Sequence, residues 1–205
     1  MDFIDTVLGP DSNRHIDFLT IHPRTRSTPS STPINVESLE ILTTKYGDRV
    51  PILVSGDVFT LNTLPFTSPL YSPTFTTKNT SSQPQQQQPT PTPEFHIPKL
   101  RGLMSARAIL ANPALFAGYD ACPWEAVETF LGNVARCPLP FKLVLHHVSE
   151  MTAPGMSATN KSALLTKQER AAMLAQCNNM VDLIDFLDEK AVAYGVNGGE
   201  GLRRI

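Results

Sequence analysis

Apolar residues in the first half of the chain fall into short continuous runs separated by a run with helical spacing. The segment DFLTI (17–21) is short and rich in β-forming residues, and VPILVSGDVF (50–59) is an almost continuous apolar run. Between them, NVESLEILTTKYG (35–47) places apolar residues at roughly helical spacing, with Asn35 as the N-cap and Gly47 as the C-cap. A continuous apolar run predicts a strand buried on both faces, as in parallel sheets. The two strands lie about 30 residues apart, the spacing of a βαβ unit.

A stretch of different composition, residues 63–98, interrupts this pattern. It contains recurring prolines and a glutamine run at 85–88. Such a composition cannot bury enough apolar surface to offset the entropy lost on ordering, so it predicts a disordered insertion. The PTPTP segment within it also has the form of a polyproline II ligand for an SH3 or WW domain, and this alternative stays open.

The strand-then-helix pattern resumes in GLMSARAILANPALFAG (102–118), where a helix is expected to open at Ala106 and continue toward Phe116. Beyond this segment the strand signals stop. Three helical segments are expected at 123–137, 140–152 and 166–194. The last of them is expected to bury one broad apolar face: Met173, Leu174, Cys177, Val181, Ile184 and Leu187. The pattern therefore predicts three βα units followed by a helical domain and a flexible tail at 195–205.

Composition narrows the class of protein. The chain has 205 residues with 17 basic and 19 acidic side chains, and 41% of its residues are hydrophobic, enough for a core. The chain has no overall basic excess of the kind that indicates nucleic-acid binding, although a local basic patch could still bind nucleic acid. The three cysteines lack CxxC spacing, and no signal peptide or apolar membrane span is visible. We therefore expect an intracellular protein, cytoplasmic or nuclear, that does not enter a membrane.

Polar or small residues follow each predicted strand. They are His22, Arg24 and Arg26 after the first, Ser55, Gly56 and Asp57 after the second, and Ser105, Ala106 and Arg107 after the third. Ligands of α/β folds bind at the carboxyl ends of strands. A helix that opens at Ala106 offers free backbone N–H groups and Arg107 adds a charge, which together predict an anion site. A tight turn with a solvated arginine would explain the same residues, and a histidine at a strand end is often only structural. His146 and His147 have no carboxylate or cysteine at ligand spacing, so we expect no metal site.

Three segments, DFLTIHPRTR, VPILVSGDVF and GLMSARAILANPALFAGY, occur in the order of the last three strands of tRNA-dihydrouridine synthases and resemble them. The helical part, from about 121 to 190, is similar in position and character to that family's C-terminal tRNA-binding domain. The proline-rich insertion indicates a member of fungal type. The resemblance implies that residues 1–119 form the C-terminal part of a TIM (β/α)8 barrel and residues 120–194 a helical tRNA-binding-type domain.

The resemblance also implies a flavoenzyme that uses FMN and NADPH to reduce uridine to dihydrouridine in the tRNA D-loop. The residues that match the family's FMN contacts are His22, Ser55, Gly56, Asp57, Ala106 and Arg107. Arg24 matches the arginine near the substrate side, and Arg26 lies beside it in the same basic loop, so both are expected to contact tRNA.

The chain departs from the family at several positions. The NxGCP motif with the catalytic cysteine is absent, and Cys122, Cys137 and Cys177 all lie in the helical part. The flavin-binding lysine of the fifth strand is absent too, Ser55 stands for the usual Asn, and Pro23 for the usual Gly. We therefore expect no catalytic residue in this chain and no uridine reduction by the chain alone.

Two alternative functions stay open. One is a non-catalytic tRNA- or RNA-binding fragment, and the other is an FMN barrel enzyme of the old-yellow type, against which the helical part argues. The phosphate-facing residues of the first would be Lys142, His146, His147, Lys161, Lys167, Arg170, Arg203 and Arg204. Four acidic residues oppose them: Asp182, Asp185, Asp188 and Glu189.

Overall fold

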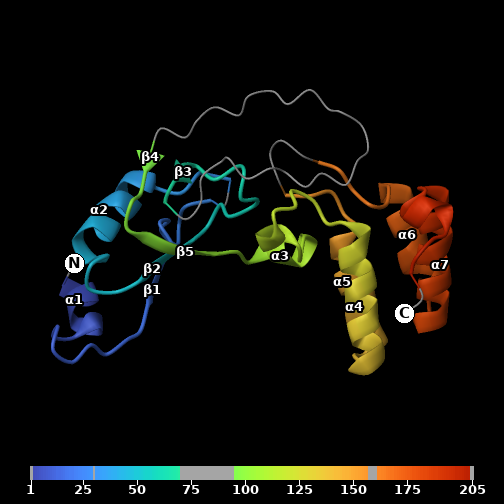
Figure 1. The fold of residues 1–205 in the computed structure, drawn as a ribbon, viewed down its shortest axis with the longest axis horizontal. Coiled ribbons are helices and arrows are strands. Elements are labelled where there is room, and N and C mark those ends of the chain that lie inside the picture. The colour runs from blue at the N-terminus through green and yellow to red at the C-terminus, as the bar shows by residue number, and fades with distance from the viewer. Residues whose placement is uncertain (1, 30, 70–94, 157–160, 204–205) are drawn as a thin grey trace. The chain divides into compact units, whose positions relative to one another are not determined.

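The computed structural model describes residues 2–29, 31–69, 95–156 and 161–203 (Figure 1). The chain divides into two compact units, and the described residues of the first end at Ala106 while those of the second begin at Arg107. The sequence pattern places this boundary later, after residue 119. The reason for the difference is that the short helix after the third strand packs on a helix of the second unit.

A three-stranded parallel sheet forms the centre of the first unit. Its strands are β1 (Leu19–Ile21), β2 (Ile52–Ser55) and β5 (Leu100–Met104), in the order β1-β2-β5. Leu19 pairs with Ile52, and Ile52 pairs with Leu100. The predicted mixed α/β fold with parallel strands is confirmed. Closure of such strands into a TIM barrel stays a prediction.

Helix α2 (Val36–Tyr46) connects β1 to β2 as the apolar spacing predicts. The Asn35 side chain accepts a hydrogen bond from the Ser38 N–H at 2.7 Å, and the Gly47 N–H closes the last turn onto Thr43. The buried face of the helix repeats every three or four residues: Val36, Leu39, Thr43 and Tyr46. Both predicted caps are therefore confirmed.

The ends of the predicted insertion are ordered, which corrects its boundaries. Strands β3 (Phe66–Thr67) and β4 (Phe95–His96) pair in parallel, and the Ile97 N–H donates to the Thr67 carbonyl at 2.8 Å. Phe66 and Ile97 are buried. The burial of these apolar side chains is sufficient to order the two ends of the proline-rich stretch. The remainder of the insertion, including the PTPTP and glutamine segments, lies outside the described residues.

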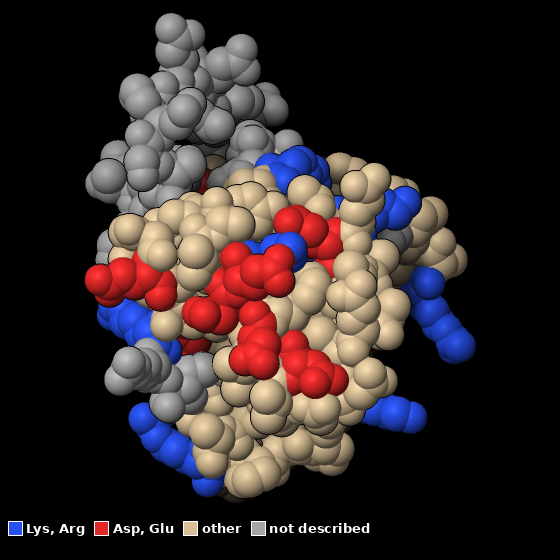
Figure 2. All heavy atoms as spheres, turned by 90° about the vertical axis from the view of Figure 1, so that its right-hand side faces the viewer, with Lys and Arg blue, Asp and Glu red and all other residues tan. Residues whose placement is uncertain are grey.

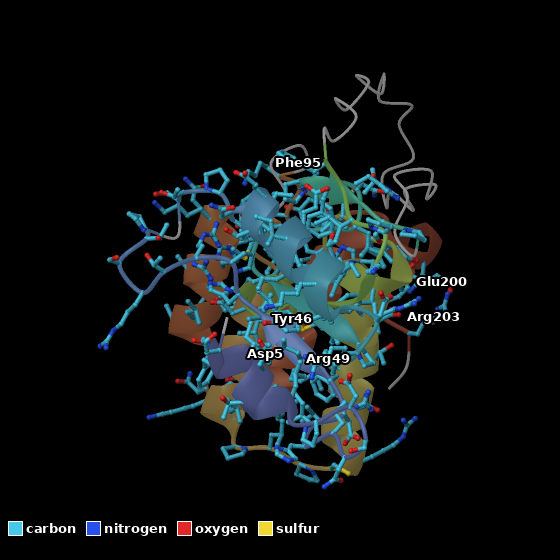
Figure 3. The ribbon with its side chains drawn as sticks, turned by 90° about the vertical axis from the view of Figure 1, so that its left-hand side faces the viewer. Asp5, Tyr46, Arg49, Phe95, Glu200 and Arg203 are labelled. Atoms are coloured by element: carbon cyan, nitrogen blue, oxygen red, sulfur yellow. The ribbon has the colours of Figure 1, made fainter. Side chains whose placement is uncertain are left out.

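Helix α1 (Asp2–Leu8) is held to the end of α2 by a network of charged and polar side chains around Asp5 (Figure 3). The Tyr46 hydroxyl donates to one carboxylate oxygen of Asp5 at 3.0 Å, and the Arg49 guanidinium donates to the other at 2.9 Å. Arg49 also pairs with Asp11 at 2.7 Å, and the Lys45 ammonium lies 3.6 Å from Asp5. The network stabilises the ionised form of Asp5.

This network predicts a pH dependence of stability. The Tyr46 hydrogen bond is the main reason that the pKa of Asp5 lies below its ordinary 3.8; partial burial opposes it, and the Arg49 and Lys45 cations add to it. Because the folded pKa is depressed, the contribution of Asp5 is fully present above 3.8 and is lost as the pH falls through the lower folded value. We expect Asp5→Asn to lower the free energy of unfolding at pH 7, measured by urea unfolding. Below pH 3.8 the difference in this free energy between the variant and the parent chain should shrink. A difference that does not shrink on acidification would contradict this role.

The second unit begins with a helix that is shorter than the sequence pattern predicts. Helix α3 spans only Arg107–Ala111, and a 3-10 turn, η1 (Leu115–Ala117), follows it. Pro113 cannot continue the helix and disfavours helical geometry at Asn112. The buried Asn112 side chain instead donates to the Tyr119 carbonyl at 2.7 Å.

Four longer helices form the core of the second unit. They are α4 (Trp124–Arg136), α5 (Phe141–Met151), α6 (Lys167–Gln176) and α7 (Met180–Ala193). The expected single segment at 166–194 is wrong, because Asn179 caps a new helix by accepting hydrogen bonds from the Val181 and Asp182 N–H groups. This change of direction leaves two residues of the expected apolar face, Leu174 and Val181, 50% and 65% exposed.

The described part of the tail is ordered, contrary to the prediction of a flexible segment. A turn, η2 (Val196–Gly199), follows α7. The Glu128 carboxylate accepts hydrogen bonds from the Asn197 amide at 3.0 Å and the Arg203 N–H at 2.9 Å. Asp188 accepts one from the Leu202 N–H at 2.8 Å. The composition of the tail could not predict that it is ordered, because the carboxylates that accept these hydrogen bonds lie in distant parts of the chain.

Candidate functional site

A nearly buried ion pair connects the loops that follow β1 and β2. The Arg24 guanidinium lies 2.5 Å from the Asp57 carboxylate, and the two side chains are only 7% and 13% exposed. Arg24 also donates to the Thr32 carbonyl at 2.7 Å, and the other oxygen of Asp57 accepts from the Ile34 N–H at 2.8 Å. Both side chains are therefore engaged by the protein itself. They hold the two loops at the carboxyl end of the sheet.

His22 and Gly56 lie against each other at this edge. A methyl group on Gly56 would lie 3.1 Å from Cε1 of the His22 ring and 2.9 Å from Ile34. Gly56 has φ of +112° and Asp57 has φ of +55°, so the chain turns sharply directly after β2. The His22 side chain is exposed. The loop thus presents bare backbone beside an accessible imidazole.

The end of β5 is connected to the same loop. The Ser105 hydroxyl donates to the Val58 carbonyl at 2.9 Å, which ties the residue after β5 to the segment after Ser55 and Gly56. Ala106 and Arg107 follow at once and are both exposed. Because α3 has five residues, its dipole is small, and the predicted anion site depends mainly on free N–H groups and the guanidinium.

The structure brings most of the predicted residues to one edge of the first unit. His22, Arg24, Gly56 and Asp57 are in direct contact or joined by one hydrogen bond, and Ser55 precedes them in β2. Arg26 is exposed in the turn after β1 and is the more accessible of the two arginines expected to contact tRNA.

Two backbone groups in this loop were not visible from the sequence. The Thr32 carbonyl and the Ile34 N–H complete the contacts of the ion pair. Neither residue type signals such a role, because the contact uses only the main chain. The following Asn35 N–H donates to the Pro23 carbonyl at 2.8 Å, so the substituted Pro23 still takes part in the loop through its acceptor.

The two buried cysteines, Cys122 and Cys177, have environments unlike that of a reactive thiol. Burial, with the Glu125 charge in addition, raises the pKa of Cys122 to about 12. Burial and then Asp182 raise the pKa of Cys177 as well. A thiol with a raised pKa is a weaker proton donor and is less often the thiolate. Each of the two buried thiols is therefore a weaker proton donor than an exposed cysteine.

Neither a metal centre nor a membrane span is found in the part of the chain that the structure describes. It contains no group of three or more His, Cys, Asp and Glu side chains that could hold a metal ion. No helix among the same residues is long and apolar enough to cross a membrane.

Several known proteins are similar to this chain along most of its length. It is 31% identical over 89% of its residues to the tRNA-dihydrouridine(20a/20b) synthase (NAD(P)+) of Saccharomyces cerevisiae. The protein of the same name from Schizosaccharomyces pombe is 31% identical over 86% of the chain. A tRNA-dihydrouridine synthase-like protein of Caenorhabditis elegans is 27% identical over 82%.

The chain spans 41%, 42% and 49% of the lengths of these three relatives. No family model and no solved structure matches it. The identity to the two yeast enzymes extends across both compact units, from the parallel sheet to the helices. The chain therefore belongs to the tRNA-dihydrouridine synthase family.

Proposed function

We propose that this chain supplies the C-terminal portion of an FMN- and NADPH-dependent enzyme that reduces uridine to dihydrouridine in the tRNA D-loop. The observation that carries the proposal is the 31% identity to two enzymes named for positions 20a and 20b. Those two positions are accordingly the proposed targets. Flavin, when bound, supplies the redox chemistry of such a reaction.

The residues at the carboxyl edge of the sheet are suited to one end of FMN. Gly56 leaves room for close approach to the backbone beside His22, and the turn at Ala106 has small side chains and an arginine next to it. We assign contacts with FMN to His22, Ser55, Gly56, Ala106 and Arg107. Since both oxygens of Asp57 are engaged, its role in this proposal is to position the loop.

FMN titration of the purified chain, followed by flavin fluorescence, tests this assignment. We expect weak binding that Arg107→Ala reduces on the order of tenfold, since a charge-assisted contact with the phosphate is lost. Arg101→Ala is the matched control, because Arg101 is also exposed and lies at the opposite end of β5. Equal effects of both variants would contradict the assignment.

A second candidate function is tRNA binding without catalysis. It is favoured by the raised pKa of the two buried thiols, Cys122 and Cys177, which makes each a weaker proton donor. The two functions differ in one assay, the reduction of uridine in an unmodified tRNA transcript with FMN and NADPH. We expect no product from this chain alone, and dihydrouridine formation would show that the family cysteine is dispensable here.

A further inference from the structure

The loop between β1 and α2 is rich in hydroxyl side chains. Six of the eight residues from 25 to 32 are serine or threonine, and proline directly follows Thr28 and Thr32. A serine or threonine followed by proline is the minimal recognition sequence of proline-directed protein kinases, which transfer phosphate to that hydroxyl group. Proline also favours an extended conformation at the residue before it, the form in which a peptide enters a kinase groove. The loop therefore contains two candidate modification sites.

The structure distinguishes these two sites from each other and from a third hydroxyl group, that of Ser68, which precedes Pro69. Ser68 is buried, with 3% of its surface exposed, so an enzyme cannot reach it in the folded chain. Thr28 is half-buried, and its hydroxyl oxygen lies 2.6 Å from that of Thr25. Thr32 is exposed, and its hydroxyl makes no hydrogen bond with the described residues. The hydroxyl–proline pairs that begin at positions 72, 90 and 92 lie outside those residues.

Thr32 is connected to the carboxyl edge of the sheet through Arg24. The Thr32 carbonyl accepts a hydrogen bond from Arg24 at 2.7 Å, and the guanidinium of Arg24 pairs with Asp57, which directly follows Gly56. His22 lies against Gly56 at the same edge. A group attached to the Thr32 hydroxyl is therefore held beside the residues to which we assign contacts with FMN.

The charge around Thr32 favours a phosphate group. Residues 22–34 contain Arg24 and Arg26 and no aspartate or glutamate. Arg26 is exposed and has no ion pair among the described residues, so its guanidinium is available to a phosphate on the same loop. The helical unit offers a contrast: Figure 2 views the side of α6 and α7 and shows acidic side chains gathered across it, where a phosphate would be repelled.

We propose that a proline-directed protein kinase phosphorylates Thr32 and that the phosphate lowers the affinity of the adjacent edge for FMN. The Thr32 hydroxyl oxygen attacks the γ-phosphorus of ATP, the bond from that phosphorus to ADP breaks, and the hydroxyl proton passes to the base of the kinase. The product carries a charge of about −1.5 to −2 at neutral pH, which pairs with Arg26 and repels the phosphate of FMN. The effect on FMN rests on the proposed function, whereas the modification site does not.

Incubation of the full chain with a purified proline-directed kinase, Mg²⁺ and ATP tests the site, with the phosphate mapped by tandem mass spectrometry. We expect Thr32 to be modified on the order of tenfold faster than Thr28, because the Thr28 hydroxyl must first leave its hydrogen bond, and Ser68 to stay unmodified. Pro33→Ala should abolish modification of Thr32. Pro29→Ala is the matched control, since it removes the other exposed proline and should leave Thr32 modified.

Two results would overturn the site. One is a phosphate on Thr28 or Ser68 in preference to Thr32, and the other is no phosphate on any of the three. If Pro33→Ala leaves the modification of Thr32 unchanged, the assignment to a proline-directed kinase is overturned.

FMN titration of the modified and unmodified chains, followed by flavin fluorescence, tests the effect on the ligand. We expect phosphorylation to weaken FMN binding on the order of threefold at physiological salt, and more at low salt, because the repulsion is screened over about 8 Å. A phosphatase should restore the affinity. Thr32→Val, incubated with the same kinase, is the control, since it accepts phosphate at every other site and should keep the affinity of the unmodified chain.

Equal weakening of the parent chain and Thr32→Val, or an unchanged affinity in a chain fully phosphorylated at Thr32, would overturn the effect on FMN. If the unmodified chain binds no FMN, the proposed FMN contacts and this effect fail together. The mapped phosphate decides the modification site by itself, so the two failures are distinguishable.

Discussion

Arg24→Met is expected to lower the free energy of unfolding of the first unit by about 3 to 5 kcal/mol. The Asp57 carboxylate, 13% exposed, would keep its hydrogen bond from the Ile34 N–H but lose its cation. A nearly buried carboxylate without a partner charge is costly because water cannot replace the lost interaction. Hydrogen exchange of the β1 and β2 amides is the suitable measurement, since the single tryptophan, Trp124, lies in the other unit.

Arg26→Met is the matched control for this prediction. It makes the same substitution two residues away at an exposed position, and we expect a change within about 0.5 kcal/mol. Asp57→Asn completes a double-mutant cycle, because asparagine tolerates a φ of +55° and still accepts from the Ile34 N–H. The double variant should lose less free energy of unfolding than the sum of the losses in the two single variants. Simple additivity would show that the ion pair contributes nothing of its own.

The ion pair changes the role that we assign to Arg24. From the sequence, both arginines after β1 are expected to contact tRNA. In the structure the Arg24 side chain is 7% exposed and is engaged by Asp57 and the Thr32 carbonyl. It is suited to positioning the loop that carries His22, whereas Arg26 is free to approach a ligand in solution.

The regular elements of the fold could be predicted because their signals are local. The continuous apolar run before Ser55 predicted β2, and Asn35 predicted the start of α2. Asn179 carries a signal of the same kind, but the apolar spacing on both sides of it hid the break between α6 and α7. Pro113 likewise marked the end of α3, and the apolar residues beyond it suggested a longer helix.

The candidate site could be predicted only as a set of strand ends. Parallel strands bring their carboxyl ends to one edge, so His22, Gly56 and Ser105 could be grouped without a structure. The contact between Arg24 and Asp57 joins residues 33 positions apart, and no local pattern reports it. Main-chain contacts such as that of Ile34 are independent of residue type, so no sequence carries them.

Deleting residues 196–205 is expected to lower the free energy of unfolding of the helical unit by about 2 kcal/mol. Val196 and Leu202 are partly buried against its core, and each contributes about 1 kcal/mol through apolar area removed from water. The deletion also removes the N–H groups that donate to Glu128 and Asp188. Trp124 fluorescence during urea unfolding reports this change, because Trp124 belongs to the same core.

Single substitutions distinguish the effect of individual contacts of the tail from the effect of removing the whole segment. Gly201 has φ of +80°, and a methyl group there would collide with the Asp188 carboxylate, so Gly201→Ala should reproduce much of the loss. Arg203→Ala keeps the backbone N–H that donates to the Glu128 carboxylate, so it should have little effect on the free energy of unfolding. If the deletion changes stability by less than about 0.5 kcal/mol, the tail does not stabilise the unit, as its glycine-rich composition predicts. A loss shared by the deletion and Gly201→Ala, but not by Arg203→Ala, assigns the stabilisation to the main chain of the tail and to Leu202.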